Sequence, residues 1–425
     1  MEKYKKRILD DKIEKLVGMM PAIAIDGAKA VGKTRTACRI AASTFEFDKP
    51  ETQTLYNINP KMIVESNTPI LLDEWQRVPE IWDTVRRLVD KDNTPAQYIL
   101  TGSAYPKDAN IHSGAGRIIH QKLYPLSLQE KFNAKEVVSI RDCFDGAVKD
   151  EFIFETKISF EDYIREITRS GFPGIYFSKE ESIPYYIETY IENIISVEML
   201  ENNYKIRKPD SMKRWLRSFA AATGTESGYN EILDNATAGE RDKPSKATTN
   251  TYREILQNLW LLEELPAWLP LEGNFNRLKA TPKHYLADPA LEAMLLKITF
   301  DEMASMKATS KFDEKYGSIV GRLFESLVAL SLRTYSSAND AGLSYLKTRN
   351  GDHEIDFILS KGKKIIAVEV KLSNDVVDSD VKHLNWLQGQ IGGNLSQKII
   401  INTGKYAYRR KEDGVIVCPA ALLGA

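Results

Sequence analysis

Residues 22–40 read AIAIDGAKAVGKTRTACRI, an apolar run followed by a glycine-containing loop and a helical stretch. The loop, residues 27–34, has the form Gly-x-x-x-x-Gly-Lys-Thr. Gly27 and Gly32 allow the backbone to curl so that successive N–H groups point toward phosphate oxygens. An apolar run before this motif and a helix after it are the context in which it binds phosphate. The stretch therefore predicts a phosphate-binding loop in a parallel α/β domain.

The last residues of the motif indicate ATP and Mg²⁺ as the ligands. Lys33 is expected to reach the β- and γ-phosphates, and the hydroxyl of Thr34 to bind Mg²⁺. The helix that begins near Thr34 adds its positive end to the phosphate site. A glycine-rich turn that matches by chance is the alternative, and the flanking strand and helix argue against it. The expected nucleotide-binding residues are Gly27, Ala28, Lys29, Ala30, Val31, Gly32, Lys33, Thr34 and Arg35.

A second apolar run, ILLDE at residues 70–74, ends in two acidic side chains. Asp73 is placed to hold Mg²⁺ through water, and Glu74 to orient the water that attacks the γ-phosphate. An Asp-Glu pair at the end of a strand is often only a solvated turn. The phosphate-binding loop upstream favours Asp73 as a magnesium and nucleotide ligand and Glu74 as a catalytic residue.

Two further segments add candidates to the same site. The run YILTGS ends with Thr101 and Ser103, either of which could sense the γ-phosphate or simply cap the strand. Farther on, HSGAGRI places Arg117 next to glycines. An arginine there could act catalytically by neutralising transition-state charge at the ATP of a neighbouring subunit, which requires a homo-oligomer. The alternative for Arg117 is an ordinary surface side chain.

Residues 354–373, EIDFILSKGKKIIAVEVKLS, carry two carboxylates and a lysine on two consecutive strand-like runs. Alternation with a period of two puts Glu369 and Lys371 on one face of the second run. Asp356 and Glu369 could then coordinate one Mg²⁺, with Glu325 completing the shell through water. Lys371 would be catalytic, because its charge lowers the pKa of an attacking water or stabilises a pentavalent phosphorane.

Charged residues at a sheet edge also prevent aggregation, which is the alternative interpretation of these side chains. Against it, Glu369 and Lys371 lie inside the apolar run IIAVEVKL, where an unpaired charge is costly. The pattern favours a metal site of the nuclease type and leaves cleavage itself open.

Between these two regions the sequence becomes helical. SKATTNTYREILQNLWLLEELPAW follows a short linker with Pro244 and is typical of the second helix of a winged helix-turn-helix. Ser245 or Thr248 could cap that helix. If the helix enters a major groove, its base-facing end carries Lys246, Thr249, Asn250 and Arg253. A spacer or protein-contact role is the alternative, because basic residues are sparse here.

Composition limits the class of protein. The chain has 425 residues, and 58 Lys and Arg against 59 Asp and Glu give a formal net charge of -1. A bulk positive field is therefore absent, and any contact with DNA must depend on a local patch. The three cysteines have no metal-ligand spacing and fit a reducing cytoplasm. Apolar stretches are too short for a transmembrane helix, so we expect a cytoplasmic protein without a membrane partner.

Several segments together resemble a large prokaryotic group of AAA+-like P-loop ATPases. They are GAKAVGKT, LLDEWQRVPEIWDTVRRLVD, YILTGSAYP, HSGAGRI, GFPGIYF and TYREILQNLWLLEELPAW. The terminal EIDFIL and AVEVKLS are similar to the PD-(D/E)XK nuclease superfamily. The segment YIENIISVEML departs from the group, because it lacks the arginine-aspartate pair expected after that helix.

The resemblance implies an α/β protein with three parts. A P-loop NTPase domain of the AAA+-like type is expected at residues 1–135, a helical and winged-helix-like region at 136–300, and a restriction-endonuclease-like α/β domain at 301–425. The implied function is Mg²⁺-dependent ATP hydrolysis coupled to a nuclease-like domain with DNA as its expected partner. The alternative is a nucleotide switch whose last domain binds protein or nucleic acid without cutting it. A P-loop small-molecule kinase is a weaker rival, because most of the chain would have no role.

Overall fold

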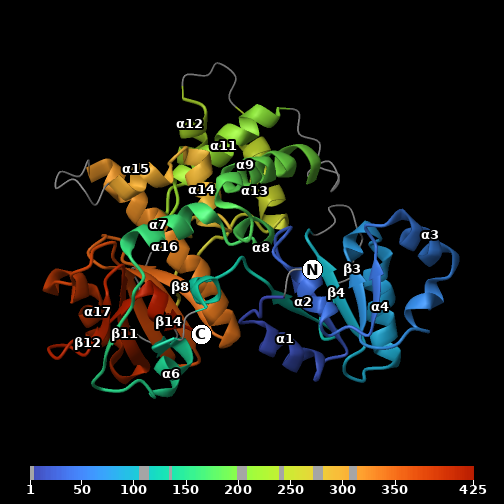
Figure 1. Ribbon diagram of the computed structural model, residues 1–425, viewed down its shortest axis with the longest axis horizontal. Coiled ribbons are helices and arrows are strands. Elements are labelled where there is room, and N and C mark those ends of the chain that lie inside the picture. Colours follow the sequence, from blue (N-terminus) through green and yellow to red (C-terminus); the bar gives the residue numbers. More distant parts are fainter. Residues whose placement is uncertain are drawn as a thin grey trace.

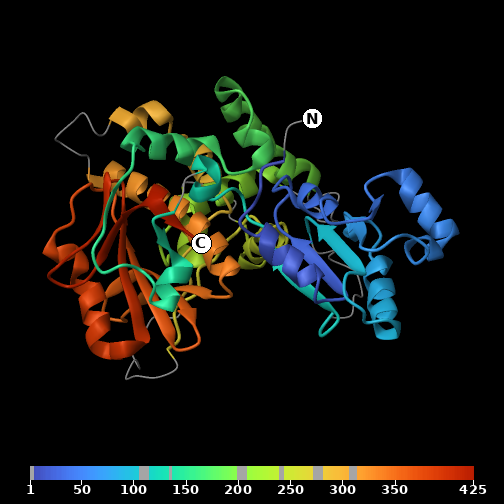
Figure 2. The ribbon, with the colours of Figure 1, turned by 60° about the horizontal axis from the view of Figure 1, so that its bottom comes forward.

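The computed structural model describes residues 4–104, 114–133, 136–198, 208–238, 244–270, 281–305 and 314–425. Two β-sheets lie on opposite sides of the molecule, one formed near the N-terminus and one near the C-terminus (Figure 1). A group of helices from the middle of the chain covers the space above and between them. The second view in Figure 2 shows the same separation of the two sheets.

The N-terminal sheet is parallel and has the strand order β2-β3-β4-β1-β5. Every residue of β1, β3 and β4 is buried, as expected for parallel strands covered on both faces. Because β4 lies between β1 and β3, the ends of all three strands meet at one edge of the sheet. The strands are β1 (Ala22–Asp26), β2 (Ser43–Glu46), β3 (Ile70–Asp73), β4 (Tyr98–Gly102) and β5 (Ile118–Lys122).

Helices and 3₁₀ turns cover both faces of this sheet. One face packs into a core with the middle helices, and the other packs against Trp75, Trp82 and their neighbours. These elements are α1 (Asp10–Val17), α2 (Lys33–Cys38), α3 (Pro50–Ile58), η1 (Pro60–Ile63), η2 (Trp75–Arg77) and α4 (Glu80–Lys91).

Helices form most of the described residues in the middle of the chain. Its elements are α7 (Phe160–Arg169), α8 (Pro173–Tyr176), η3 (Glu180–Ser182), α9 (Ile183–Asn193), η4 (Ile194–Glu198), α11 (Pro209–Ala221), α12 (Tyr229–Ala236), α13 (Lys246–Asn258), α14 (Pro289–Leu296) and α15 (Phe300–Ser305). After α13 the chain is extended, and antiparallel bridges join Leu262 to Leu286 and Leu265 to Lys283.

Ser245 caps α13, since its side chain accepts a hydrogen bond from the backbone N–H of Thr248. Thr249 does not face outward as predicted, because it is buried on the packed side of the helix next to Tyr252. The Arg253 guanidinium lies 4.5 Å from the ring centroid of Tyr229 on α12. Lys246 and Asn250 are exposed.

The C-terminal sheet has the order β7-β12-β13-β11-β10-β9-β8. Strands β8, β9 and β10 form an antiparallel meander, and β11 then pairs parallel with β10. The two strand-like runs expected within residues 354–373 form β9 and β10. The elements are α16 (Glu314–Ala338), β8 (Gly342–Lys347), β9 (Glu354–Lys361), β10 (Lys364–Val370), α17 (Asp378–Ile391), η6 (Gly392–Asn394), β11 (Leu395–Asn402), β12 (Tyr406–Arg409), β13 (Ile416–Pro419), η7 (Ala420–Leu422) and β14 (Leu423–Gly424).

A segment that looks irregular in the sequence, residues 133–157, contributes to this sheet. Its elements, together with the helix that precedes them, are α5 (Leu128–Phe132), β6 (Val138–Ser139), α6 (Ile140–Asp145) and β7 (Ile153–Glu155). Strand β7 pairs with β12 in this sheet, and β6 pairs with β14 in a separate two-stranded sheet. The boundaries expected from the sequence put these strands in the middle region, whereas they pair with strands of the last hundred residues. Within the described ranges, no helix is long and apolar enough to cross a membrane.

Candidate functional site

The loop between β1 and α2 is held in a backbone conformation that requires its glycines. Gly27 has φ +143, and a Cβ there would lie 2.3 Å from the carbonyl oxygen of Leu123. Gly32 has φ +104 at the start of α2. Both values lie in the region that side chains other than glycine rarely adopt. The loop can therefore turn tightly at the end of β1 and present its N–H groups to a phosphate.

Lys33 is buried at the start of α2. Its ammonium donates to the carbonyl oxygens of Gly27 at 2.9 Å and Ala28 at 3.0 Å. Burial lowers the pKa of Lys33 to about 8, and the charge of Glu74 partly opposes that change. A negatively charged ligand in the loop would favour the protonated form, because it supplies the opposite charge that burial makes necessary.

Asp73 lies at the centre of the polar groups beside the loop. Its Oδ1 accepts a hydrogen bond from Thr34 at 2.8 Å and a second from the hydroxyl of Thr101. Burial raises the pKa of Asp73, whereas the two hydroxyl donors act in the opposite direction. The magnesium ligands predicted from two separate motifs are thus in contact, and one of the two sensor candidates holds them in place.

Glu74 follows Asp73 in the left-handed backbone region, with φ +54. This conformation directs its carboxylate toward Ser103, whose hydroxyl lies 3.1 Å from Oε2, and toward the side-chain amide of Gln76. Thr101 and Ser103 therefore have different partners: Thr101 contacts Asp73, and Ser103 contacts Glu74. Backbone strain of this kind is concentrated at functional sites.

An ion pair that the sequence did not indicate flanks the loop on the other side. His120 Nδ1 on β5 lies 2.6 Å from Oδ2 of Asp26, the last residue of β1. The hydrogen bond to Asp26 raises the pKa of His120. No motif contains this pair, because its two members come together only through the pairing of β1 with β5.

Arg117 lies away from the phosphate loop of its own chain. Because Ala22 pairs with Ile118, the start of β5 is at the edge of the sheet opposite the loop. Its Nε lies 2.5 Å from Oδ1 of Asp90 on α4, and an NH group donates to the carbonyl of Ala115. A contact between Arg117 and ATP would therefore need a second chain.

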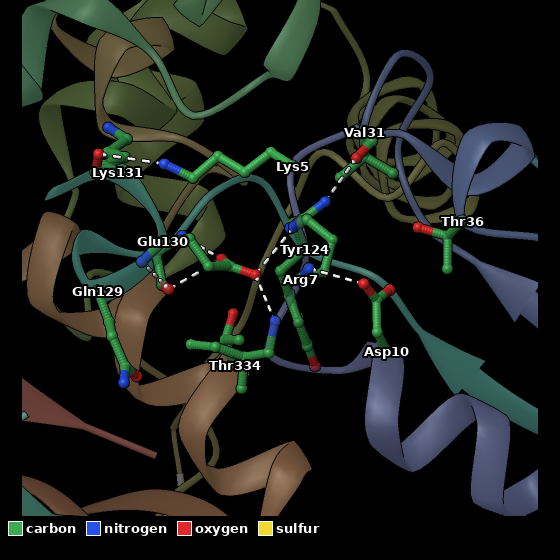
Figure 3. Close-up of polar contacts among 12 residues, drawn as sticks. Lys5, Arg7, Asp10, Val31, Thr36, Tyr124, Gln129, Glu130, Lys131 and Thr334 are labelled. Atoms are coloured by element: carbon green, nitrogen blue, oxygen red, sulfur yellow. Dashed lines mark hydrogen bonds and ion pairs between the residues drawn. The ribbon is translucent and has the colours of Figure 1, made fainter. Parts of the chain in front are cut away.

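The segment before α1 closes over the end of the loop (Figure 3). The buried guanidinium of Arg7 donates to Val31 at 3.0 Å, to Tyr124 at 2.6 Å and to Glu130 at 2.9 Å. Figure 3 shows Arg7 between Glu130 and the phosphate loop. The charge of this arginine is used inside the fold, where it fixes the N-terminal segment against the loop.

A cavity of about 360 Å³ lies beside the same end of the loop. The aromatic rings of Tyr4 and Phe177 contribute to it from segments far apart in the sequence. The hydroxyl of Tyr4 is fixed by Asp10 at 2.8 Å, and the Phe177 side chain is 43% exposed. The lining residues are Tyr4, Lys5, Arg7, Gly32, Arg35, Thr36, Leu126, Pro173 and Phe177.

The C-terminal candidates come together at β9, β10 and α16. Lys371 Nζ lies 3.4 Å from Oε2 of Glu369, and Asp356 accepts the backbone N–H of Val370 at 2.9 Å. Burial and the charge of Asp356 raise the pKa of Glu369 well above its usual range. The predicted proximity of Glu369 to Lys371 is correct.

A lysine that belongs to none of the sequence motifs occupies the middle of the cluster. Lys283 Nζ lies 3.3 Å from Glu325, 3.4 Å from Asp356 and 3.0 Å from Glu354. Tyr285 donates to Glu325 at 2.5 Å, and burial raises the pKa of Glu325 to about 7. Among the described residues, no group of three or more His, Cys, Asp or Glu is arranged to hold a metal ion. Two of the three expected magnesium ligands, Glu325 and Asp356, instead contact the Lys283 ammonium, and the third, Glu369, contacts Lys371.

Three family models match successive parts of the chain. Residues 20–132 match the model of an AAA domain, residues 160–302 that of one domain of unknown function (DUF8612), and residues 320–423 that of another (DUF4143). An uncharacterized protein of Mycobacterium tuberculosis is 21% identical over 368 residues, 85% of this chain and 72% of the relative. One of Haemophilus influenzae is 24% identical over 353 residues, 82% of this chain and 75% of the relative.

Solved structures of low similarity include the Walker-type ATPase PABY2304 of Pyrococcus abyssi and the ORC2 protein of Aeropyrum pernix. The first has 13% identity and a TM-score of 0.38 and covers 67% of this chain and 94% of its own. The second has 14% identity and a TM-score of 0.33 and covers 73% of this chain and 98% of its own. The AAA-domain match covers the phosphate loop, Asp73 and Thr101. Residues 20–132 therefore have the fold of an AAA-type P-loop ATPase domain.

Proposed function

We propose that the N-terminal domain binds ATP with Mg²⁺ and hydrolyses it. The observation that carries the proposal is the position of Asp73, which links the hydroxyl of Thr34 in the phosphate loop to Thr101 at the end of β4. A hydroxyl and a carboxylate side by side are the hard oxygen donors that Mg²⁺ prefers. The bound ion would neutralise charge on the β- and γ-phosphate oxygens.

The side chains around Asp73 have separate tasks in this proposal. Lys33 moves its ammonium from the loop carbonyls to the phosphates, which offer it full negative charge. Glu74 orients the attacking water, and Ser103 and Gln76 hold the Glu74 carboxylate in position. Thr101 keeps Asp73 turned toward Thr34. The buried walls of the site exclude bulk water from these contacts.

The cavity beside the loop is suited to the nucleobase. A base has two π-faces, and stacking on aromatic side chains is favourable and largely independent of its identity. Tyr4 and Phe177 supply such rings next to Gly32 and Thr36, where the ribose and base of a loop-bound nucleotide would project. The aromatic lining supports a nucleoside triphosphate over inorganic phosphate as the ligand.

Arg117 extends the proposal to a homo-oligomer. Its place at the sheet edge opposite its own loop leaves it on a surface that a second chain could approach. In that assembly Arg117 would leave Asp90 and neutralise transition-state charge at the neighbour's ATP. Light scattering with and without a non-hydrolysable ATP analogue tests this step, and a monomer under both conditions would contradict it.

For the last part of the chain we propose a nuclease-like domain that acts on DNA. A helix, an antiparallel three-stranded meander, a second helix and a parallel fourth strand follow one another in α16 to β11, which supports this proposal. Glu325, Asp356, Glu369 and Lys371 lie at one place on that scaffold. Lys246 and Asn250 on α13 are exposed and could contact DNA.

A second candidate is a nucleotide-controlled module that binds DNA or protein without cutting it. It is favoured by Lys283, whose ammonium already pairs with two carboxylates of the proposed cleavage site, Glu325 and Asp356, and with the neighbouring Glu354. The two candidates share the ATPase and differ only in what the C-terminal domain does.

One set of assays tests the ATPase. Phosphate release is measured for the wild type, Lys33→Ala, Glu74→Gln and a control, Glu80→Gln, which changes an exposed glutamate on α4. Glu74→Gln should bind ATP and hydrolyse it about 100-fold more slowly, whereas Lys33→Ala should lose binding. Equal hydrolysis by Glu74→Gln and wild type would contradict the role of Glu74.

A second set tests the C-terminal domain. Supercoiled and single-stranded DNA are incubated with Mg²⁺ or Mn²⁺, with and without ATP, and Asp356→Ala and Lys371→Ala are run beside the wild type. Cleavage that is lost in both variants would support the nuclease. ATP hydrolysis without cleavage of any DNA would favour the binding module.

A further inference from the structure

The position of Lys283 carries a further inference, which rests on the proposed C-terminal site. Its ammonium is within 3.4 Å of one oxygen each from Glu325, Glu354 and Asp356, and its side chain is 1% exposed. These three carboxylates come from α16 and β9 of the C-terminal domain. The lysine comes from the extended segment before α14. A buried ammonium with three carboxylate partners from another part of the fold marks a position that requires positive charge.

The cluster resembles a cation site in its donors and differs in its spacing. Hard divalent cations bind carboxylate oxygens at about 2.0–2.6 Å. Here the oxygens stand 3.0 Å to 3.4 Å from a nitrogen. A metal in the same place would thus need the lysine to leave and the oxygens to move inward by about 1 Å. Lysine and a divalent cation cannot occupy the position together, because both need the same oxygens and their charges repel.

Lys283 is fixed to the middle of the chain by its backbone. Its N–H and carbonyl both pair with Leu265, and the N–H of Glu263 donates to Tyr285. Tyr285 also binds Glu325, and Tyr345 on β8 donates to the carbonyl of Thr281. The segment from residue 281 to 286 therefore pairs by its backbone with the extended strand after α13, and that strand in turn bonds to Tyr345 on β8 through Pro266 and Trp268.

The same strand contacts the ATPase domain. Glu263 forms an ion pair with Lys122 at the end of β5, and its backbone carbonyl accepts a hydrogen bond from Arg333 on α16. Lys122 lies two residues after His120, which binds Asp26 next to the phosphate loop. A displacement of β5 would therefore act on the extended strand whose Leu265 pairs with the backbone of Lys283.

We propose that Lys283 is a resident counter-cation that closes the carboxylates of the C-terminal domain to divalent metal, and that Mg²⁺ or Mn²⁺ enters only when the segment from 281 to 286 withdraws. The chain thereby keeps a nuclease-like site inactive until the middle region moves. The alternative is a permanent structural ion pair, in which no metal binds even after the lysine is removed.

Binding of Mn²⁺ without nucleotide tests the proposal, measured by electron paramagnetic resonance of the free ion and by the Tm with and without Mn²⁺. Lys283→Met should bind one additional Mn²⁺ at least about tenfold more tightly than the wild type and gain Tm when Mn²⁺ is added. Lys283→Met/Asp356→Asn should lose that gain. A folded Lys283→Met that binds Mn²⁺ no better than the wild type would overturn the proposal.

Two further variants separate the position of Lys283 from net charge and from a loss of folding. Lys347→Met is the matched control, because Lys347 bridges Glu226 and Glu354 at 2.7 Å and 2.8 Å at the edge of the same cluster. Lys347→Met should bind no additional Mn²⁺. If it binds as much additional Mn²⁺ as Lys283→Met, the effect comes from net charge alone and the proposal is contradicted. If Lys283→Met does not fold, Lys283→Met/Glu354→Gln replaces it, because this variant removes one charge of each sign. Tighter Mn²⁺ binding than in the wild type would then support the proposal, and no tighter binding would overturn it. Neither outcome of the Mn²⁺ experiment depends on ATP hydrolysis. A failure of the proposed ATPase function would therefore be seen separately, in the phosphate-release assay.

Discussion

Arg7 Nε lies 2.9 Å from Oε1 of Glu130, and both side chains are almost completely buried. The pair joins the segment before α1 to α5, and Arg7 also binds Val31 of the phosphate loop (Figure 3). Breaking such a pair leaves one charge buried without compensation. We expect Arg7→Met to lower the free energy of unfolding by about 3–5 kcal/mol, measured by urea denaturation.

The control for Arg7→Met is the double variant Arg7→Met/Glu130→Gln, which should recover part of the lost stability. Burial by itself would raise the pKa of Glu130, but Arg7 and the backbone N–H groups of Ser127 and Ile8 outweigh it and lower the pKa. A lowered carboxyl pKa adds stability above the unfolded value of about 4.3, and this stability is lost as the pH falls through the folded value. Arg7→Met should weaken that acid dependence. If the free energy of unfolding falls at acid pH as steeply in Arg7→Met as in the wild type, the role of the pair is contradicted.

Thr101 and Ser103 can be separated by substitution. Thr101→Val keeps the size of a buried side chain and removes its hydrogen bond to Asp73. We expect ATP hydrolysis to fall by about 100-fold with little change in the Kd for ATP, because the carboxylate can turn away from Thr34. Ser103→Ala should have a smaller effect, since Gln76 still contacts Glu74. Steady-state phosphate release and ATP titration measure both quantities, and equal losses in the two variants would show that the Asp73 contact has no special role.

Phe177→Ala tests the cavity beside the loop. Loss of a stacking surface should raise the Kd for ATP by about tenfold, in line with about 1–3 kcal/mol per stacked base. The affinity for inorganic triphosphate should stay the same, because that ligand has no base. Phe154→Ala is a matched control, since the exposed fractions of Phe154 and Phe177 are 47% and 43% and Phe154 lies on β7. If the Kd for inorganic triphosphate rises as much as the Kd for ATP, Phe177 affects phosphate binding by the loop and does not act by stacking on the base.

The sequence was most informative where one local motif holds all the necessary residues. The phosphate loop, the strand before it and Asp73 could be predicted because backbone geometry at Gly27 and Gly32 limits which residues fit. In the C-terminal sheet, β9 and β10 followed from their apolar runs. In contrast, β7 is short and fully exposed along its length, so no periodicity distinguishes it from a loop.

The residues that could not be predicted from the sequence act through contacts between distant segments. Tyr4 and Phe177 meet only at the cavity, and His120 reaches Asp26 only through strand pairing. Lys283 is one lysine in a segment without a motif, and two of its partners are 42 and 73 residues away. The stretch PKHYLADP, in which a lysine stands close to apolar residues, was the only available signal for it.

Glu292 gives a pH prediction with a defined sign. It is fully buried on α14, and its Oε1 accepts the backbone N–H of Leu286 at 2.8 Å. Burial raises its pKa to about 8, against about 4.3 in an unfolded chain. Between these values the folded state keeps a proton that the unfolded state loses, so the free energy of unfolding should fall as the pH rises from about 4.3 to about 8.

Glu292→Gln should remove this slope, because glutamine does not titrate and its Oε1 can keep the bond to Leu286. The variant should therefore be more stable than the wild type at pH 8 and nearly equal to it at pH 4, as measured by urea denaturation at both values. Glu231→Gln, which changes an exposed glutamate on α12, serves as the control and should leave the slope intact. If Glu292→Gln is less stable than the wild type at pH 8, the carboxylate must be ionised and paired in the folded state, and the assignment of a neutral Glu292 is wrong.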